Sequence, residues 1–149
     1  HSSYICRTFY NAACGCIIVS MAISDLKYHE LTEKIIGCAM KVHRHFGAGF
    51  PEIVYKRALV IELRKIGISC KEEVEMPIIY DETTIYKRRL DLLAEDVVLI
   101  ELKALKEVDN GEMNQVLNYL RVFKIEVGLL LNFGAPSLFF KRYILTLKH

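Results

Sequence analysis

The spacing of apolar residues changes along the chain, and each change predicts a helix or a strand. Helical spacing marks residues 31–46, where Gly47-Ala48-Gly49 ends the pattern, and again residues 52–66, which follow Pro51 and precede Gly67. A third helix is expected over residues 112–123. The stripe of the first helix consists of Leu31, Ile35, Ala39, Val42 and Phe46.

Strand-like patterns fill most of the remaining chain. The expected strands cover residues 68–80, 85–93, 97–104, 127–133 and 143–147, with a turn at 81–84. Pro77 predicts an edge strand or a bulge, because proline cannot donate to a ladder. Residues 97–104 are nearly all apolar, which is typical of a central strand covered on both faces.

The predicted element order is ααβββαββ, which indicates an α/β or α+β domain built on a single sheet. Three strands in succession predict an antiparallel meander. The helix at 112–123 then returns the chain to the sheet as a crossover.

Residues 1–20 lack clear helical or strand periodicity and precede Met21, so we expect an extension outside a single domain at 21–149. The chain has five cysteines, and an odd number argues against a closed disulfide framework. Cys14-Gly-Cys16 could hold a metal, but no second Cys or His pair stands at ligand spacing. A reduced, cytoplasmic setting is the better expectation.

Composition narrows the class further. The 149 residues are 52% hydrophobic and 26% charged, which excludes a disordered chain. Lys+Arg 20 against Asp+Glu 18 leaves a net charge of +2, so the chain is no strong polycation, although a local basic face stays open. No apolar run reaches the roughly 18 residues of a membrane span, so we expect no membrane insertion.

The informative residues are charges within the apolar strand at 97–104. Glu101 and Lys103 share one face of it, and burying either without a partner would cost several kcal/mol. An exposed strand end or an ion pair would explain them without function. However, pairing across the turn at 94–96 places Asp91 opposite about residue 100, beside Glu101. Two adjacent carboxylates need a cation or a shared proton.

Asp, Glu and Lys together are the components of a Mg²⁺ or Mn²⁺ site, with an ammonium group to orient water. Glu52 lies on the core-facing stripe of the second helix, although the helix dipole alone also favours an acidic residue there. Gln115 and Tyr119 stand at i and i+4 and could reach one site, but a wide apolar arc is the simpler explanation.

Gly49-Phe50-Pro51-Glu52-Ile53-Val54-Tyr55 is a literal G-x-x-E-x-x-Y motif. With the other motifs in their order, the chain resembles, from about residue 31 to 143, the bacterial and archaeal GxxExxY family of the PD-(D/E)XK nuclease superfamily. The other motifs are Val42-His43, Asp91-Leu92-Leu93, Glu101-Leu102-Lys103-Ala104, Gln115 to Tyr119, and Gly128 to Gly134.

The resemblance implies a restriction-endonuclease-like core, in which helices flank a central mixed sheet. It implies that Asp91 and Glu101, with Glu52 beside them, hold Mg²⁺ or Mn²⁺, and that Lys103 is the catalytic lysine. Gln115 and Tyr119 would correspond to the Q-x-x-x-Y element of exonuclease-like branches.

The implied function is metal-dependent hydrolysis of phosphodiester bonds in DNA or RNA. Arg88, Arg89 and Lys56 are candidate phosphate contacts, whereas we expect Lys141 and Arg142 to be ordinary solvated surface. Small nucleases of this type often work as dimers, so a homodimer fits the resemblance. The alternatives are a non-catalytic nucleic-acid- or protein-binding module on the same scaffold, and an ion cluster that only stabilises the fold.

Overall fold

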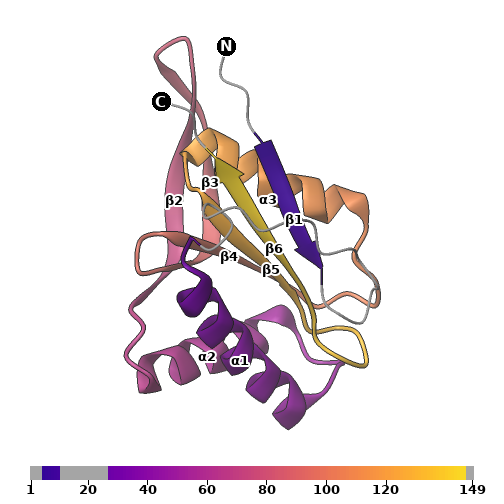
Figure 1. The fold of residues 1–149 in the computed structure, drawn as a ribbon. Coiled ribbons are helices and arrows are strands. Elements are labelled where there is room, and N and C mark those ends of the chain that lie inside the picture. The colour runs from indigo at the N-terminus through magenta and orange to yellow at the C-terminus, as the bar shows by residue number, and fades with distance from the viewer. Residues whose placement is uncertain (1–4, 11–26, 147–149) are drawn as a thin grey trace.

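The computed structural model describes residues 5–10 and 27–146, and a six-stranded mixed sheet lies at its centre (Figure 1). Helices α1 (His29–Phe46) and α2 (Glu52–Lys65) cover one face, and α3 (Asn110–Phe123) covers the other. The strands are β1 (Ile5–Tyr10), β2 (Cys70–Tyr80), β3 (Thr83–Ala94), β4 (Val98–Lys103), β5 (Val127–Asn132) and β6 (Phe139–Thr146).

The strand order is β1-β6-β5-β4-β3-β2, and β4–β5 is the parallel pair of this sheet. The expected meander of β2, β3 and β4 is confirmed, and so is the crossover through α3 to β5. The architecture is therefore α+β with a restriction-endonuclease-like arrangement, as the sequence predicted.

Two apolar clusters pack on the two faces of the sheet. Val98, Ile100 and Leu102 of β4 face α1 and α2, and Leu99 between them faces Val116 of α3. Both faces of β4 are thus covered, which explains why its sequence is nearly all apolar.

Two segments differ from the sequence prediction. Strand β1 comes from the region that we expected to lie outside the fold, and it pairs with β6 along its whole length. Strand β6 begins at Phe139 instead of residue 143. Cys14, Cys16 and the rest of the predicted extension lie outside the described residues.

The expectation that Lys141 and Arg142 are solvated surface is wrong, since they are 5% and 7% exposed. The Lys141 amine lies 3.3 Å from the Met113 sulfur, and the Arg142 guanidinium donates to the Lys27 carbonyl. Two consecutive cations suggested solvent, but long side chains can bury their stems within a sheet while their heads find partners.

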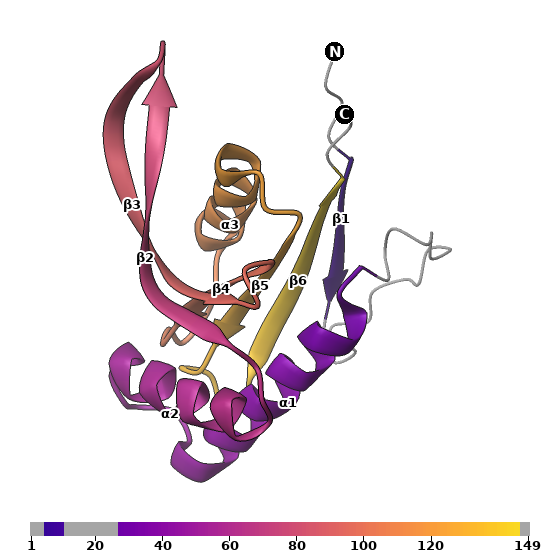
Figure 2. The ribbon, with the colours of Figure 1, turned by 90° about the vertical axis from the view of Figure 1, so that its left-hand side faces the viewer.

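The hairpin of β2 and β3 extends beyond the sheet (Figure 2). Only residues 92–94 of β3 pair with β4, whereas β3 pairs with β2 from Thr83 onward. Asp81 and Glu82 form its turn, both with positive φ, as a two-residue hairpin turn requires. Pro77 lies in edge strand β2, and the register shifts after Ile78, as its edge-or-bulge prediction anticipated.

Among the described residues, no helix combines the length and apolar character needed to cross a bilayer.

Candidate active site at the β3–β4 fork

The candidate site lies where β3 separates from β4. The last paired residues are Leu92 and Ile100, and beyond them β3 bends away. An Asp91 carboxylate oxygen (Oδ2) accepts a hydrogen bond from the Leu102 N–H at 3.0 Å. The side chain therefore occupies the place of a ladder partner, which fixes the carboxylate against β4.

The bend in β3 is also visible in its packing. Leu90 and Leu92 are both fully buried, yet Leu90 joins the cluster under α3 and Leu92 the cluster under α1 and α2. Side chains two residues apart on a regular strand point to the same face. The strand must therefore twist strongly at Asp91.

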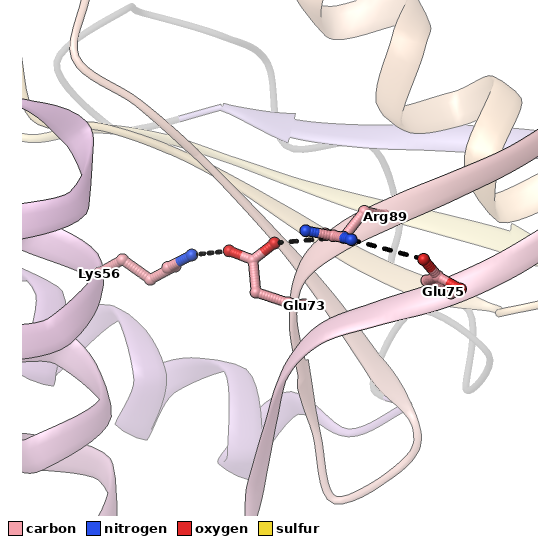
Figure 3. A network of polar contacts seen from close by, with 4 residues as sticks. All are labelled: Lys56, Glu73, Glu75 and Arg89. Carbon is pink, nitrogen blue, oxygen red and sulfur yellow. Dashed lines mark hydrogen bonds and ion pairs between the residues drawn. The ribbon is translucent and has the colours of Figure 1, made fainter.

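Glu73 lies opposite this bend on β2, between the paired positions 72–92 and 74–90. Its φ of 53° is left-handed, which is unfavourable for a residue other than glycine. Its carboxylate forms an ion pair with the Lys56 ammonium and lies 4.0 Å from Arg89, which in turn lies 3.4 Å from Glu75 (Figure 3). These contacts fasten the hairpin to α2.

Glu101 is 2% exposed, and one of its carboxylate oxygens, Oε1, has no hydrogen-bond partner among the described residues. Burial and the neighbouring charge of Asp91 raise the pKa of Glu101 to about 8, and the charge of Arg88 opposes this rise. The sequence placed Asp91 beside Glu101, and the structure brings the two carboxyl groups together. The alternative of an exposed strand end does not hold for Glu101.

The electrostatics of Glu52 link it to Asp91 and to Lys103. Burial raises the pKa of Glu52, the charge of Asp91 raises it further, and the ammonium groups of Lys103 and Lys56 lower it. Glu52 is thus within electrostatic reach of Asp91 and Lys103, although it remains exposed in the first turn of α2. Glu52 shares the helix face of Tyr55 and Leu59, which are buried, but its own side chain at the start of the helix stays exposed.

The remaining residues of the G-x-x-E-x-x-Y motif position Glu52. Tyr55 is fully buried, and its hydroxyl donates to the Gly47 carbonyl at 2.6 Å and accepts from the Phe50 N–H at 3.2 Å. Gly49 has a φ of 109°, which disfavours any other residue. The tyrosine therefore ties the connection between α1 and α2 to the second turn of the helix that carries Glu52.

Residues at the end of β5 fix the segment after Lys103. The buried Asn132 side chain accepts from the Leu105 N–H at 2.8 Å and donates to the Leu105 carbonyl at 2.9 Å. A Cβ on Gly134 would lie 2.3 Å from the Leu105 backbone, so glycine permits this close approach. The Asn-x-Gly sequence directly after an apolar strand was the signal from which this contact could have been predicted.

Tyr119 and Arg88 lie on the α3 side of Glu101. The Arg88 guanidinium lies 5.0 Å from the centre of the Tyr119 ring. Burial raises the pKa of Tyr119, Arg88 lowers it, and the charges of Glu101 and Asp91 raise it, which places Tyr119 within electrostatic reach of both carboxylates. Gln115 lies half-buried one turn earlier on α3.

The three predicted phosphate contacts differ in access. Arg89 is exposed but lies beside Glu73 and Glu75, and Lys56 is 7% exposed with its ammonium paired to Glu73. For Lys56 to reach a phosphate, this ion pair would have to open. Arg88 is half-buried against Tyr119.

Asp91 and Glu101 are the residues best placed to hold a divalent ion. In the part of the chain that the structure describes, no group of three His, Cys, Asp or Glu side chains forms a ready-made metal cluster. Mg²⁺ commonly uses one or two carboxylates and completes its shell with water and substrate oxygens. The pair, with its unpartnered Glu101 oxygen, fits this preference.

A family model described as PD-(D/E)XK nuclease superfamily matches residues 29–143, from the start of α1 into β6. The chain belongs to the PD-(D/E)XK nuclease superfamily. No curated protein and no solved structure matches it significantly. The superfamily match covers every element that contributes to the β3–β4 fork, and it leaves β1 outside.

Proposed function

We propose that the chain is a metal-dependent nuclease of the GxxExxY family that hydrolyses phosphodiester bonds in DNA or RNA. The observation that carries the proposal is the buried Glu101 carboxylate, unpartnered at Oε1 among the described residues and set beside Asp91 where β3 and β4 separate. Burying two adjacent carboxyl groups destabilises a fold unless a cation or proton compensates them. Superfamily membership supports a nucleic-acid substrate.

Asp91 and Glu101 would hold Mg²⁺ or Mn²⁺, and Glu52 would add negative charge beside them. When bound, such an ion polarises a phosphate oxygen and lowers the pKa of a water molecule. The hydrogen bond from the Leu102 N–H keeps Asp91 in place, so the carboxylate needs little rearrangement to bind.

Lys103 would supply the positive charge that offsets the negative charge growing on the phosphate as water attacks. The structure supports this role through the influence of its ammonium group on Glu52, and through the Phe133 N–H, which donates to the Lys103 carbonyl at 2.8 Å and fixes its backbone. Tyr119 and Gln115 would contact the substrate from α3, and Arg88 would neutralise phosphate charge beside Tyr119.

A cytoplasmic location and a homodimeric state stay predictions from the sequence. Sedimentation measurements on the full chain would test the second.

Cleavage of labelled single- and double-stranded DNA and RNA, with Mg²⁺ and with Mn²⁺, tests the proposal. We expect Lys103→Ala to lower the cleavage rate by about 10²- to 10³-fold, since it removes one charge that stabilises the transition state. Lys106→Ala, at an exposed position three residues later, is the matched control and should cleave at the wild-type rate.

Metal binding to Lys103→Ala, followed by calorimetry, should persist. If the wild type cleaves no substrate but still binds nucleic acid, the scaffold is a binding module instead. Equal cleavage by Lys103→Ala and the wild type would refute the assigned role of Lys103.

A further inference from the structure

The hairpin that carries Asp91 also carries an exposed apolar end. We call residues 74–90 the arm and the side chains of Ile79, Tyr80, Ile85 and Tyr86 its tip. Each tip side chain is between 60% and 74% exposed. The described part of the chain has ten exposed large apolar residues, and four of them are at the tip. Figure 2 shows that the arm rises clear of the sheet, with α3 on its inner side.

Contacts with α3 and α2 hold the base of the arm, so the fold itself fixes the arm in its projecting position. An isolated two-stranded hairpin is marginally stable in water. Here Met76 and Leu90 pack in the cluster under α3, and the Lys56–Glu73 ion pair fastens the outer side to α2 (Figure 3). A fixed arm whose end carries several exposed apolar side chains is typical of a binding element.

The open edge of β2 is poorly suited to pair with a strand of a second copy. Pro77 lacks an N–H, Glu73 has a left-handed backbone, and the register shifts after Ile78. These features are the means by which natural edge strands avoid edge-to-edge pairing. The tip is therefore expected to work through its side chains.

The charges along β3 indicate what the side chains meet. Between the tip and Asp91 lie Lys87, Arg88 and Arg89, and Lys87 is exposed and forms no ion pair with any described residue. At the apex, Asp81 and Glu82 are exposed and would repel a phosphate backbone. Arg89 already lies beside Glu73 and Glu75, so Lys87 is the cation of this run that is open to a phosphate on the stem, and the tip would meet bases.

We infer that the arm binds the substrate of the proposed nuclease, with Tyr80 and Tyr86 stacking on unpaired bases a few nucleotides from the scissile phosphate. Tyr86 precedes Asp91 by five residues, which is about 17 Å along a strand and corresponds to a few nucleotides. Since stacking on the tip needs accessible base faces, the substrate class is a single strand or a duplex with an unpaired segment. This inference rests on the proposed function for the location of the scissile phosphate.

Binding measured without cleavage tests the inference. The fluorescence anisotropy of a labelled single-stranded oligonucleotide, titrated with protein in EDTA, reports affinity while a metal-dependent reaction is blocked. We expect Tyr80→Ala/Tyr86→Ala to weaken binding about 10- to 100-fold. Tyr80→Phe/Tyr86→Phe keeps both rings and should bind within about twofold of wild type. Ile61→Ala, an exposed apolar position on α2, is the matched control and should bind normally.

A direct reporter is available because the chain contains no tryptophan. Tyr80→Trp places a single indole at the tip, and its fluorescence should be quenched when the single strand is added, whereas a fully paired blunt duplex should quench it much less. Absence of quenching, or equal affinity of the alanine variant and wild type, would overturn the inference.

The possible outcomes distinguish a failure of the inference about the arm from a failure of the proposed function. Tip-dependent binding by a protein that cleaves nothing leaves the inference standing and refutes the nuclease. Full cleavage by a tip variant whose affinity is unchanged supports the nuclease and refutes the inference about the arm. If the alanine variant changes only the oligomeric state in sedimentation measurements, the tip is a contact between copies, and the inference is wrong.

Discussion

At the scale of single residues, the unusual group is the Glu101 carboxyl. It lies among apolar neighbours on β4 with Asp91 beside it, and Arg88 only partly offsets the two acids. Burial alone would favour the protonated form of Glu101, and the Asp91 charge favours it further. Without a bound ion, the Glu101 carboxyl of the folded protein therefore keeps its proton up to about pH 8. In the unfolded chain the same group would lose its proton near pH 4.5.

This difference predicts how stability depends on pH. Because the folded pKa of Glu101 is about 8 and thus above its ordinary value of 4.5, the folded state binds more protons between these values. The stabilising contribution is full below about pH 4.5 and is lost as the pH rises to about 8, with a slope of up to about 1.4 kcal/mol per pH unit. Urea unfolding from pH 5 to 9 measures it.

Glu101→Gln cannot ionise and should lose this dependence, so wild type minus variant isolates the contribution of Glu101. Glu107→Gln, at an exposed position, should behave like wild type. A constant difference between wild type and Glu101→Gln across this pH range would contradict the raised pKa.

At the scale of elements, the connection between α1 and α2 shows how a short motif positions a side chain. Tyr55 stacks on Phe133 at 4.7 Å and bonds the loop at both Gly47 and Phe50. One buried residue thus joins the loop, helix α2 and the end of β5. This arrangement also fixes the position of Glu52, because Glu52 lies one turn before Tyr55 on the same helix.

Tyr55→Phe should lower the free energy of unfolding by about 1 to 3 kcal/mol, since it leaves the Gly47 carbonyl and the Phe50 N–H without this hydroxyl. Denaturant unfolding measures the change. Tyr80→Phe, at a position 74% exposed, is the control and should change stability by less than about 0.5 kcal/mol. An unchanged midpoint for Tyr55→Phe would show that the hydroxyl does not hold the loop.

Sequence periodicity predicted the helices and the central strands, because each buries a regular apolar stripe. It could not predict the start of β6, where Lys141 and Arg142 interrupt the apolar pattern but are buried against neighbours distant in the sequence. The same applies to β1, whose pairing with β6 is a long-range contact.

The candidate site was predictable where two strands are joined by a short turn. Pairing across residues 95 and 96 brings Asp91 close to Glu101 along the strand, and the observed register differs from the prediction by only one residue. The ion pair of Lys56 with Glu73 joins α2 to β2, so its effect on access to Lys56 could not be deduced from local patterns.

At the scale of the whole molecule, the candidate site draws its residues from several elements at once. The β3–β4 fork contributes Asp91, Glu101 and Lys103, α2 contributes Glu52, and α3 contributes Tyr119. A ligand that binds only this folded arrangement must stabilise the entire domain.

Mg²⁺ or Mn²⁺ at about 100 times its dissociation constant should therefore stabilise the protein by about 2.7 kcal/mol, which for a chain of this size raises Tm by about 5 to 10 °C. Thermal unfolding with and without the ion measures the shift. Asp91→Asn/Glu101→Gln should show none. Asp81→Asn/Glu82→Gln, which makes the same chemical changes at the exposed hairpin turn, should keep it. An equal shift in both variants would place the ion elsewhere.

The parallel pairing of β4 with β5 has a consequence for how the chain folds. The β2–β3–β4 meander joins neighbours in sequence and can form early, whereas β5 reaches β4 only after α3 has closed a long loop. The contacts that immobilise the backbone after Lys103 come from β5 and the residues that follow it. A partly folded chain can thus bring Asp91 and Glu101 together before the backbone after Lys103 is fixed, so the proposed catalytic arrangement should be completed late in folding.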